Sequence, residues 1–335
     1  MLEAEINNAS HGEKQGSSIL IKQLTKRYPR STSAAVDAVN LEIEPGEFVV
    51  LLGPSGCGKT TLLKMINRIY EPTGGMIEIN GEDVLSRSPS ELRRQIGYVI
   101  QQTGLFPHMS VAANISVVPS LLKWSKSKTN DRVNELLDLV GLPHADYANR
   151  YPTQLSGGEQ QRVGLARALA VTPPTMLMDE PFGALDAITR RRLQNALVRI
   201  HQQISQTVVF VTHDIDEALR LADKIAVMRE GRIEQYGTPL EIMQSPANDF
   251  VASLVGADDV LRRFSLITAG DAMDPLTPDI EDAPRVDHSA LLRDVLGLMA
   301  ETGASFLVVT NSESDEPVGM LSFESIQRAA APTKE

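Results

Sequence analysis

The amino-acid sequence predicts an α/β domain with a mainly parallel sheet, followed by a small α+β module. Short apolar strands alternate with helical stretches between Ser18 and about Val255, which is the order typical of a parallel α/β sheet. The chain has 335 residues, enough for one large domain and a small second one. A glycine-rich loop of the phosphate-binding type lies between an expected strand and an expected helix.

Hydrophobic periodicity indicates where the main elements lie. Apolar runs predict strands at Phe48–Leu52, Met176–Met178, Val208–Thr212 and Ile225–Met228. Apolar residues on one helical face predict two helices, one carrying Val133, Leu136, Leu137 and Val140 and the other Leu193, Leu197, Ile200 and Ile204.

The expected organisation has four parts. Residues 1–17 form a polar, disordered leader without the apolar core of a secretory signal. Residues 18–255 form the α/β domain, with a helical subdomain at about 104–170. Residues 256–267 form a charged hinge, and residues 268–330 form the second module.

The second module is expected to have the order βαββα. A helix at Ser289–Ala300, strands at Phe306–Val309 and Val318–Leu321, and a last helix from Phe323 predict this order. A unit of this size is too small to be a second catalytic domain.

Charge and composition exclude several classes of partner. The net charge is −11, and residues 256–335 hold 15 acidic and 6 basic residues, or −9, which leaves −2 for the first 255. Binding to nucleic acid needs clustered positive charge, so we expect no nucleic-acid partner. Cys57 is the one cysteine, so no intrachain disulfide can form, and a reducing compartment is expected. The longest apolar runs are far shorter than the roughly 20 residues that span a bilayer.

The strongest local motif is the loop from residue 53 to residue 60, which matches G-x-x-x-x-G-K-[ST]. Its glycines allow successive backbone N–H groups to point at an anion, and the following helix adds partial positive charge. Lys59 is expected to reach the β- and γ-phosphates, Thr60 to hold Mg²⁺, and Thr61 to contact the α- or β-phosphate. The alternative is a plain glycine-rich turn with a solvated lysine. The expected nucleotide-binding residues here are Gly53, Pro54, Ser55, Gly56, Cys57, Gly58, Lys59, Thr60 and Thr61.

Two further strand ends carry polar residues. Asp179 and Glu180 end the apolar run that begins at Thr175, and in folds with such a loop this strand lies beside the loop's own strand. Asp179 is therefore expected near Mg²⁺, and Glu180 is expected to act as general base on the attacking water. His213 follows the strand Val208–Thr212 and is expected to donate a hydrogen bond to the γ-phosphate. Taken alone, the acids would be interpreted as a solvated strand end and His213 as a loop residue.

The segment Leu155–Arg162 reads L-S-G-G-E-Q-Q-R. Ser156 is expected to cap a helix over Gln160–Ala170, with Glu159 as the capping-box partner. Two glycines leave the start of this helix accessible to an anion. On physical grounds alone, an ordinary capped helix explains the segment equally well.

Together these motifs resemble the ATP-binding subunits of ABC transporters, and the resemblance covers residues 18 to about 255. It implies a P-loop NTPase fold with ATP and Mg²⁺ as ligands. It also implies that Tyr28 stacks on adenine, that Gln101 contacts Mg²⁺ and senses the membrane subunit, and that His213 is the switch histidine. Glu159 stands where many relatives carry glutamine, beyond the residues that face the phosphate.

The resemblance further implies two copies of the chain arranged head to tail. The segment Leu155–Arg162 would be the family's signature, whose Ser156, Gly157 and Gly158 complete the site of the other copy. Asp186 would lie in the D-loop. The implied partners are integral-membrane permease subunits and, indirectly, a solute-binding protein. The implied location is peripheral, at the cytoplasmic face of the inner membrane.

Two features indicate which branch of the family the chain resembles. The stretches Asn114–Trp124 and Ala218–Met228 resemble importers of quaternary amines such as glycine betaine, choline or carnitine. Residues Thr268–Arg328 resemble a regulatory module of the cystathionine-β-synthase type (CBS). In relatives this module senses ionic strength or a nucleotide, and the tails of two subunits are expected to pair. The alternative is an interaction tail of unrelated fold.

Other functions remain as alternatives. One is an ABC importer ATPase for a sugar, an amino acid or a metal. A non-transport ABC ATPase is disfavoured because the chain has one cassette and only Thr61–Leu155 separate loop and signature. A regulator that binds ATP without hydrolysis is disfavoured by the presence of Glu180 and His213.

Overall fold

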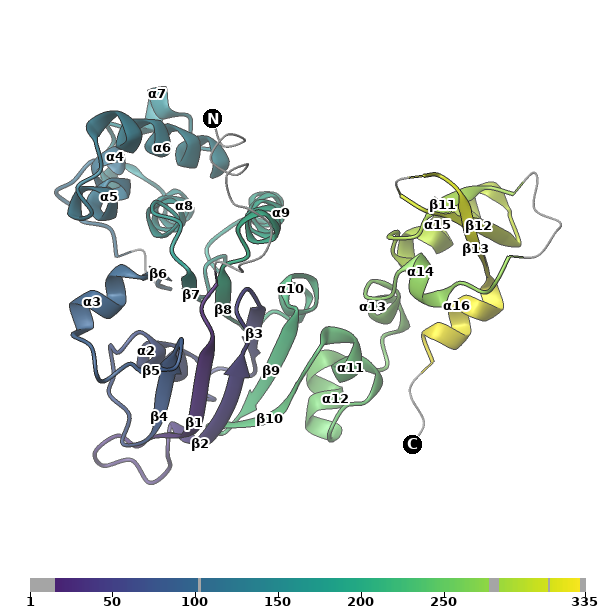
Figure 1. Ribbon diagram of the computed structural model, residues 1–335, viewed down its shortest axis with the longest axis horizontal. Coiled ribbons are helices and arrows are strands. Elements are labelled where there is room, and N and C mark those ends of the chain that lie inside the picture. The colour runs from purple at the N-terminus through teal and green to yellow at the C-terminus, as the bar shows by residue number, and fades with distance from the viewer. Residues whose placement is uncertain (1–15, 102–103, 277–282, 313, 332–335) are drawn as a thin grey trace. The chain divides into compact units, whose positions relative to one another are not determined.

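The structure is a computed structural model, shown in Figure 1, that describes residues 16–101, 104–276, 283–312 and 314–331. The chain forms two compact units. The first runs to His213 and includes Met228–Ile233, and the second comprises Asp214–Val227 with Glu234–Glu335. The second unit thus includes Asp214–Val227 and residues 234–255, which the sequence assigns to the α/β domain. The domain division at residues 255 and 268 stays a prediction.

The described residues form three sheets, with the strand orders β10-β9-β3-β8-β7-β6, β2-β1-β4-β5 and β11-β12-β13. The strands are β1 Ile19–Lys26, β2 Val36–Ile43, β3 Phe48–Leu52, β4 Gly74–Ile79, β5 Glu82–Asp83, β6 Ile96–Val99, β7 Thr175–Asp179, β8 Thr207–Thr212, β9 Lys224–Arg229, β10 Arg232–Gly237, β11 Arg285–Asp287, β12 Phe306–Thr310 and β13 Pro317–Ser322.

The helices lie between these strands and after them. They are α2 Lys59–Ile66, α3 Pro89–Arg94, α4 Val111–Ile115, α5 Val117–Leu121, α6 Lys126–Leu139, α7 His144–Tyr147, the 3-10 helix η1 Pro152–Gln154, α8 Gly157–Ala168, α9 Ala187–Ile204, α10 Ile215–Leu221, α11 Pro239–Gln244, α12 Asp249–Val255, α13 Val260–Phe264, α14 Ala269–Ala272, α15 Leu292–Thr302 and α16 Phe323–Ala329.

The central strands β3, β7 and β8 are buried at every residue, as expected for parallel strands covered on both faces. β3 pairs with β8, β8 with β7, and β7 with β6, all in parallel. The registers bring the four strand ends level, with Leu52 opposite Thr212, Val211 opposite Asp179 and Val99 opposite Met178. The loops that follow these strands therefore start at one edge of the sheet.

The predicted strands are confirmed, with small differences at their ends. β3 has the predicted bounds, and β7 is one residue longer at each end. The helix expected after the glycine-rich loop is α2, which begins at Lys59 and has Gly58, in a left-handed conformation, as its N-cap.

The structure describes only the last two residues of the predicted leader, Gly16 and Ser17. Residues 1–15 lie outside the described residues. Ser17 is buried, and its carbonyl oxygen accepts a hydrogen bond of 2.6 Å from the Thr207 hydroxyl. Gly16 is equally constrained, since a Cβ there would stand 2.3 Å from the Gly46 nitrogen. The end of the expected leader is thus part of the folded domain.

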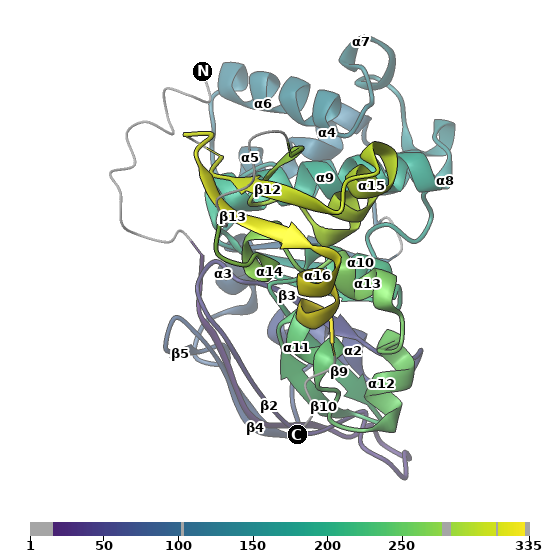
Figure 2. The same ribbon diagram turned by 90° about the vertical axis from the view of Figure 1, so that its right-hand side faces the viewer.

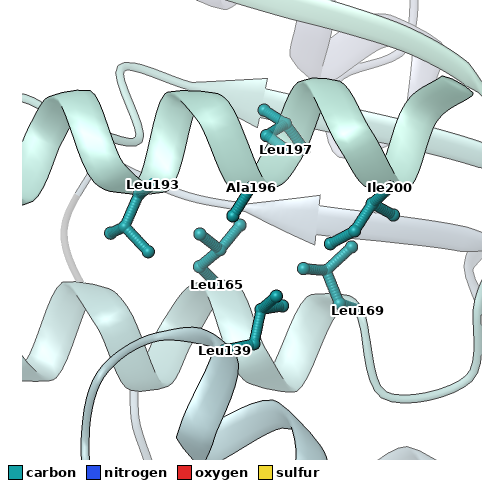
Figure 3. A pocket seen from close by; sticks show the side chains of 7 residues that line it. All are labelled: Leu139, Leu165, Leu169, Leu193, Ala196, Leu197 and Ile200. Carbon is teal, nitrogen blue, oxygen red and sulfur yellow. The ribbon is translucent and has the colours of Figure 1, made fainter.

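The expected helical subdomain contains α4 to α8, which gather together in Figure 1. Its helix α6 meets α8 and α9 at a narrow apolar pocket, shown in Figure 3. The side chains that line this pocket are Leu139, Leu165, Leu169, Leu193, Ala196, Leu197 and Ile200. Hydrophobic contact therefore joins the signature helix α8 to α9.

The C-terminal module has the expected order βαββα, formed by β11, α15, β12, β13 and α16. β11 and β12 are parallel, whereas β12 and β13 are antiparallel, and Figure 2 shows β12 and β13 side by side. Its buried core includes Leu292, Val295, Leu307 and Leu321.

The segment expected to be a hinge, residues 256–267, contains the helix α13. Asp259 caps this helix, and Arg262 forms an ion pair of 3.1 Å with Asp216 on α10. Phe264 and Ile267 belong to the hydrophobic core of the C-terminal module. These contacts join residues that are distant in sequence, so periodicity over this short charged segment does not indicate them, and the role of the segment as a hinge stays a prediction.

Among the described residues, no helix combines the length and the apolar character needed to cross a membrane.

Candidate functional site

The polar residues that follow β3, β7, β8 and β6 meet at the carboxyl edge of the parallel sheet. This is the edge where ligands bind in open α/β sheets. The level strand ends explain why motifs far apart in sequence come together here.

The glycine-rich loop encloses its lysine. Lys59 is only 5% exposed, and its Nζ donates hydrogen bonds to the carbonyl oxygens of Gly53 at 2.6 Å and Pro54 at 3.0 Å. Pro54, Ser55 and Gly56 are exposed at the tip of the loop. The ammonium group is thus held beneath a solvent-facing loop, where an anion could reach it.

Gly58 and Gly56 show why this loop needs glycine. Gly58 has φ of 113°, and a Cβ on it would stand 2.3 Å from the carbonyl oxygen of Ala35. Gly56 has φ of 82° with open space around it. Left-handed backbone at these positions turns N–H groups inward, which is the geometry of an anion-binding nest.

Thr60 and Asp179 form the next contact. The Thr60 hydroxyl donates a hydrogen bond of 2.8 Å to Asp179 Oδ1. Asp179 is 2% exposed, and burial raises the pKa of its carboxyl above its ordinary value, while the Thr60 hydroxyl acts in the opposite direction. A buried carboxylate beside a hydroxyl offers the hard oxygen ligands that Mg²⁺ prefers.

These two residues fit a magnesium ion that shares its remaining ligands with phosphate and water. In the described part of the chain, no group of three or more His, Cys, Asp or Glu side chains could hold a metal unaided. In phosphate sites Mg²⁺ usually takes part of its coordination from the phosphates and from water.

Glu180 connects two other motifs. Gln101 Nε2 donates to Glu180 Oε2 at 3.2 Å, and His213 Nδ1 lies 3.2 Å from Glu180 Oε1. Glu180 is partly buried, whereas Gln101 and His213 are exposed. The structure thus brings Gln101 and the expected switch histidine, His213, each within hydrogen-bonding distance of the expected base, Glu180.

The signature segment forms the capped helix start that the sequence predicts. Ser156 N–H donates to Glu159 Oε2 at 2.7 Å, and the Ser156 hydroxyl accepts from Glu159 N–H at 3.3 Å. The Ser156 N–H and the Tyr147 hydroxyl lower the pKa of Glu159 below its ordinary value. Ser156 and Gly157 are exposed and Gly158 is partly so, and these positions lie at the start of a helix of 12 residues.

Two expected site residues have their described contacts elsewhere. Asp186 is the N-cap of α9, where its Oδ1 accepts from Ile188 N–H at 3.1 Å and from Thr189 N–H at 3.0 Å. Tyr28 follows β1 and packs edge-on against Tyr70, with ring centroids 5.9 Å apart.

One contact was not predicted from the sequence. Gln161, on α8, bonds to the backbone of Glu180 and of Ala184. It lies on the same helical face as the buried Gly164 and Leu165. A polar residue on an apolar face was the available signal, because buried polar groups usually have a specific partner.

Residues 36–183 match the ABC transporter family model. The chain is 47% identical over 306 residues to the osmoprotectant import ATP-binding protein OsmV of Salmonella typhimurium, covering 90% of this chain and 78% of that protein. It is 47% identical over 294 residues to the glycine betaine/carnitine/choline transport ATP-binding protein OpuCA of Bacillus subtilis, covering 88% and 76%.

A solved structure also matches. The dimeric post-hydrolysis state of the ATP-binding cassette MJ0796, bound to ADP and Pi, has a TM-score of 0.62 and 35% identity. The match covers 66% of this chain and 98% of that one. With a P-loop, paired acids, a signature helix and relatives of this similarity, the chain belongs to the ABC transporter family, as an ATP-binding subunit.

Proposed function

We propose that this chain hydrolyses ATP at the described site and energises the import of a quaternary-amine osmoprotectant through a membrane permease. The contact of Glu180 with both Gln101 and His213 carries the catalytic part of the proposal. The similarity to OsmV and OpuCA supports the solute class, since both alignments extend over 88% or more of this chain.

In the proposed reaction, Glu180 accepts a proton from water as that water attacks the γ-phosphorus. The bond from the γ-phosphorus to the bridging oxygen breaks and leaves ADP and phosphate. Lys59 and the loop N–H groups stabilise the negative charge of the phosphates, and His213 donates a hydrogen bond to the γ-phosphate. Tyr28 supports the adenine, and Thr61 contacts the α- or β-phosphate.

Thr60 and Asp179, with Gln101, would hold Mg²⁺, which neutralises charge on the β- and γ-phosphates when bound. The buried Asp179 carboxylate supports this assignment, because a cation offsets the cost of burying it. Chelation with EDTA should abolish turnover. Asp179→Asn should raise the magnesium concentration needed for half-maximal rate, and an unchanged magnesium dependence would remove Asp179 from the proposed ligands.

The proposed assembly contains two copies of this chain with permease subunits at the cytoplasmic face of the inner membrane, and indirectly a solute-binding protein. Ser156, Gly157 and Gly158 of each copy would approach the ATP bound to the other, with Asp186 and its loop close to the interface. Exposed residues at the start of α8 support this arrangement, because a helix N-terminus attracts phosphate.

We also propose that the C-terminal module is a CBS-like regulatory domain. Its βαββα order and its own hydrophobic core support the proposal. Ionic strength is one candidate signal, since the Debye length falls from about 10 Å at 0.1 M salt to about 3 Å at 1 M. An ATPase rate that responds to salt identically after removal of residues 268–335 would contradict this role.

Uptake measurements test the transport function. The chain and the membrane proteins that co-purify with it are placed in vesicles, and ATP-dependent uptake of labelled glycine betaine, choline and carnitine is compared with uptake of a sugar and an amino acid. Uptake of the quaternary amines, abolished by Lys59→Ala, is the expected result. Uptake of another solute alone would establish a different importer, and the absence of any membrane partner would refute the transport function.

A further inference from the structure

A buried glutamine joins the signature helix to the loop that carries Glu180. Gln161 is 4% exposed, and its Nε2 donates a hydrogen bond of 3.1 Å to the Glu180 carbonyl oxygen. Its Oε1 accepts a hydrogen bond of 3.0 Å from Ala184 N–H. One side-chain amide therefore bonds to both ends of the loop 180–184.

The Glu180 backbone needs such support. Its φ is 46°, a left-handed conformation that costs a non-glycine residue about 1–3 kcal/mol unless surrounding contacts enforce it. Glu180 N–H donates to the Val211 carbonyl oxygen at 3.0 Å, and the Glu180 carbonyl oxygen also accepts from Gly183 N–H at 3.3 Å. Since the backbone sets the direction of the side chain, these hydrogen bonds help to fix the direction of the Glu180 carboxylate.

The middle of the loop has a different anchor. Phe182 is 1% exposed and packs against Phe210, with ring centroids 5.7 Å apart. This contact anchors the middle of the loop in the hydrophobic core but does not bind the peptide groups at the two ends of the loop. Those peptide groups are the ones that Gln161 binds.

We propose that Gln161 is a positioning residue for ATP hydrolysis, which holds Glu180 in its left-handed conformation and links it to the signature helix. The described bonds of Gln161 go to the backbone, so it acts through the position of Glu180 and not on the nucleotide. The inference rests on the proposed role of Glu180 as general base. Because Gln161 lies on α8 and Ser156 caps the same helix, movement of the signature helix would be transmitted to the base.

Gln161→Met tests the proposal, because methionine has similar length and no amide. Loss of both hydrogen bonds should lower kcat about tenfold while the KM for ATP changes less than about twofold. Gln194→Met is the matched control, because Gln194 is a comparably buried glutamine, 6% exposed, on α9 and outside the site. Its kcat should stay within about twofold of the wild-type value.

Gln161→Glu separates the two bonds. It keeps an acceptor for Ala184 N–H but places a carboxylate oxygen opposite the Glu180 carbonyl oxygen, so kcat should fall at least as far as in Gln161→Met. This variant carries the test if Gln161→Met does not fold, as judged by its melting temperature. Wild-type kcat in Gln161→Glu would show that donation to Glu180 has no role.

The results distinguish this inference from the assignment of the base. If Glu180→Gln abolishes turnover but Gln161→Met retains wild-type kcat, only the positioning role is refuted. A rise in KM with unchanged kcat, or an equal loss of kcat in Gln194→Met, would also refute it. If Glu180→Gln itself turns over normally, the base assignment fails.

Discussion

The two ends of the proposed ATP site differ in how completely one chain assembles them. One end, called the cradle here, consists of the loop 53–60 and the polar residues at the neighbouring strand ends. In the cradle, Thr60 already contacts Asp179, and Gln101 and His213 already contact Glu180. At the signature end, Ser156 uses its N–H and hydroxyl to bond Glu159, and the start of α8 faces solvent.

The glycines show the same difference. A Cβ on Gly58, in the cradle, would stand 2.3 Å from a backbone oxygen of the same chain, whereas a Cβ on Gly157 would meet nothing within 4 Å. Intrachain packing thus requires glycine in the cradle but not at Gly157. The space around Gly157 would admit a second copy with its bound ATP, as proposed above.

The largest expected effect concerns the cradle end. Glu180→Gln removes the proposed base but keeps the size of the side chain, so ATP hydrolysis should fall about 10²–10⁴-fold, while ATP still binds. Phosphate release and equilibrium nucleotide binding measure the two effects separately. A normal rate of phosphate release would show that another group activates the water.

Alkylation of Cys57 tests whether nucleotide occupies the loop. Cys57 is the one cysteine of the chain, is 5% exposed, and its Sγ lies 3.8 Å from Lys59 Nζ. Activity should fall in proportion to labelling, by about tenfold when nine-tenths of the thiol is modified, and Mg-ATP should slow the labelling, because bound ligand protects the folded loop. Full activity after stoichiometric labelling would contradict the placement of the loop.

A smaller effect is expected at the signature end, from the capping box. Glu159→Ala leaves Ser156 N–H without its carboxylate partner and should lower the free energy of unfolding by about 1 kcal/mol, as loss of a helix cap usually does. Glu159→Gln keeps an acceptor and should retain most of the stability and activity. Thermal melting with ATPase assays compares the three chains.

The pKa of Glu159 predicts how its contribution to stability changes with pH. Hydrogen bonds hold the pKa of Glu159 below its ordinary value of 4.5, so the folded state favours the carboxylate. Its stabilising contribution is therefore present above pH 4.5 and is lost as the pH falls below that value. Glu159→Gln should lack this loss. If the wild type and Glu159→Gln lost stability equally at low pH, the role of the carboxylate would be contradicted.

Sequence predicted most of the cradle because its chemistry lies in short segments. The loop 53–60 and the acids after β7 each follow a buried strand, and parallel pairing brings those strand ends to one edge of the sheet. The sequence therefore indicated both the fold and the neighbours of Lys59, Asp179, Glu180 and His213.

Tertiary contacts determined what was missed. The sequence did not predict the helix α13, in which Arg262 forms an ion pair with Asp216 and Phe264 enters the core of the C-terminal module. Likewise, the hydrogen bond from Gln161 to Glu180 depends on the left-handed backbone conformation of Glu180, which no local sequence pattern predicts.

The state of association with ATP bound tests the two-copy site most directly. Glu180→Gln, which should retain ATP, is compared with the double variant Glu180→Gln/Gly157→Glu. Within one chain, the added glutamate meets open space and lies in the first turn of α8, where a negative charge is favourable. Across the interface, however, it would repel the phosphates of the partner's ATP.

Sedimentation with and without Mg-ATP provides the measurement. The account predicts that Glu180→Gln becomes a dimer on addition of Mg-ATP, whereas the double variant stays a monomer with an unchanged or higher melting temperature. A monomer in both cases, or an equally stable ATP-dependent dimer in both, would contradict a site completed by the signature of a second copy.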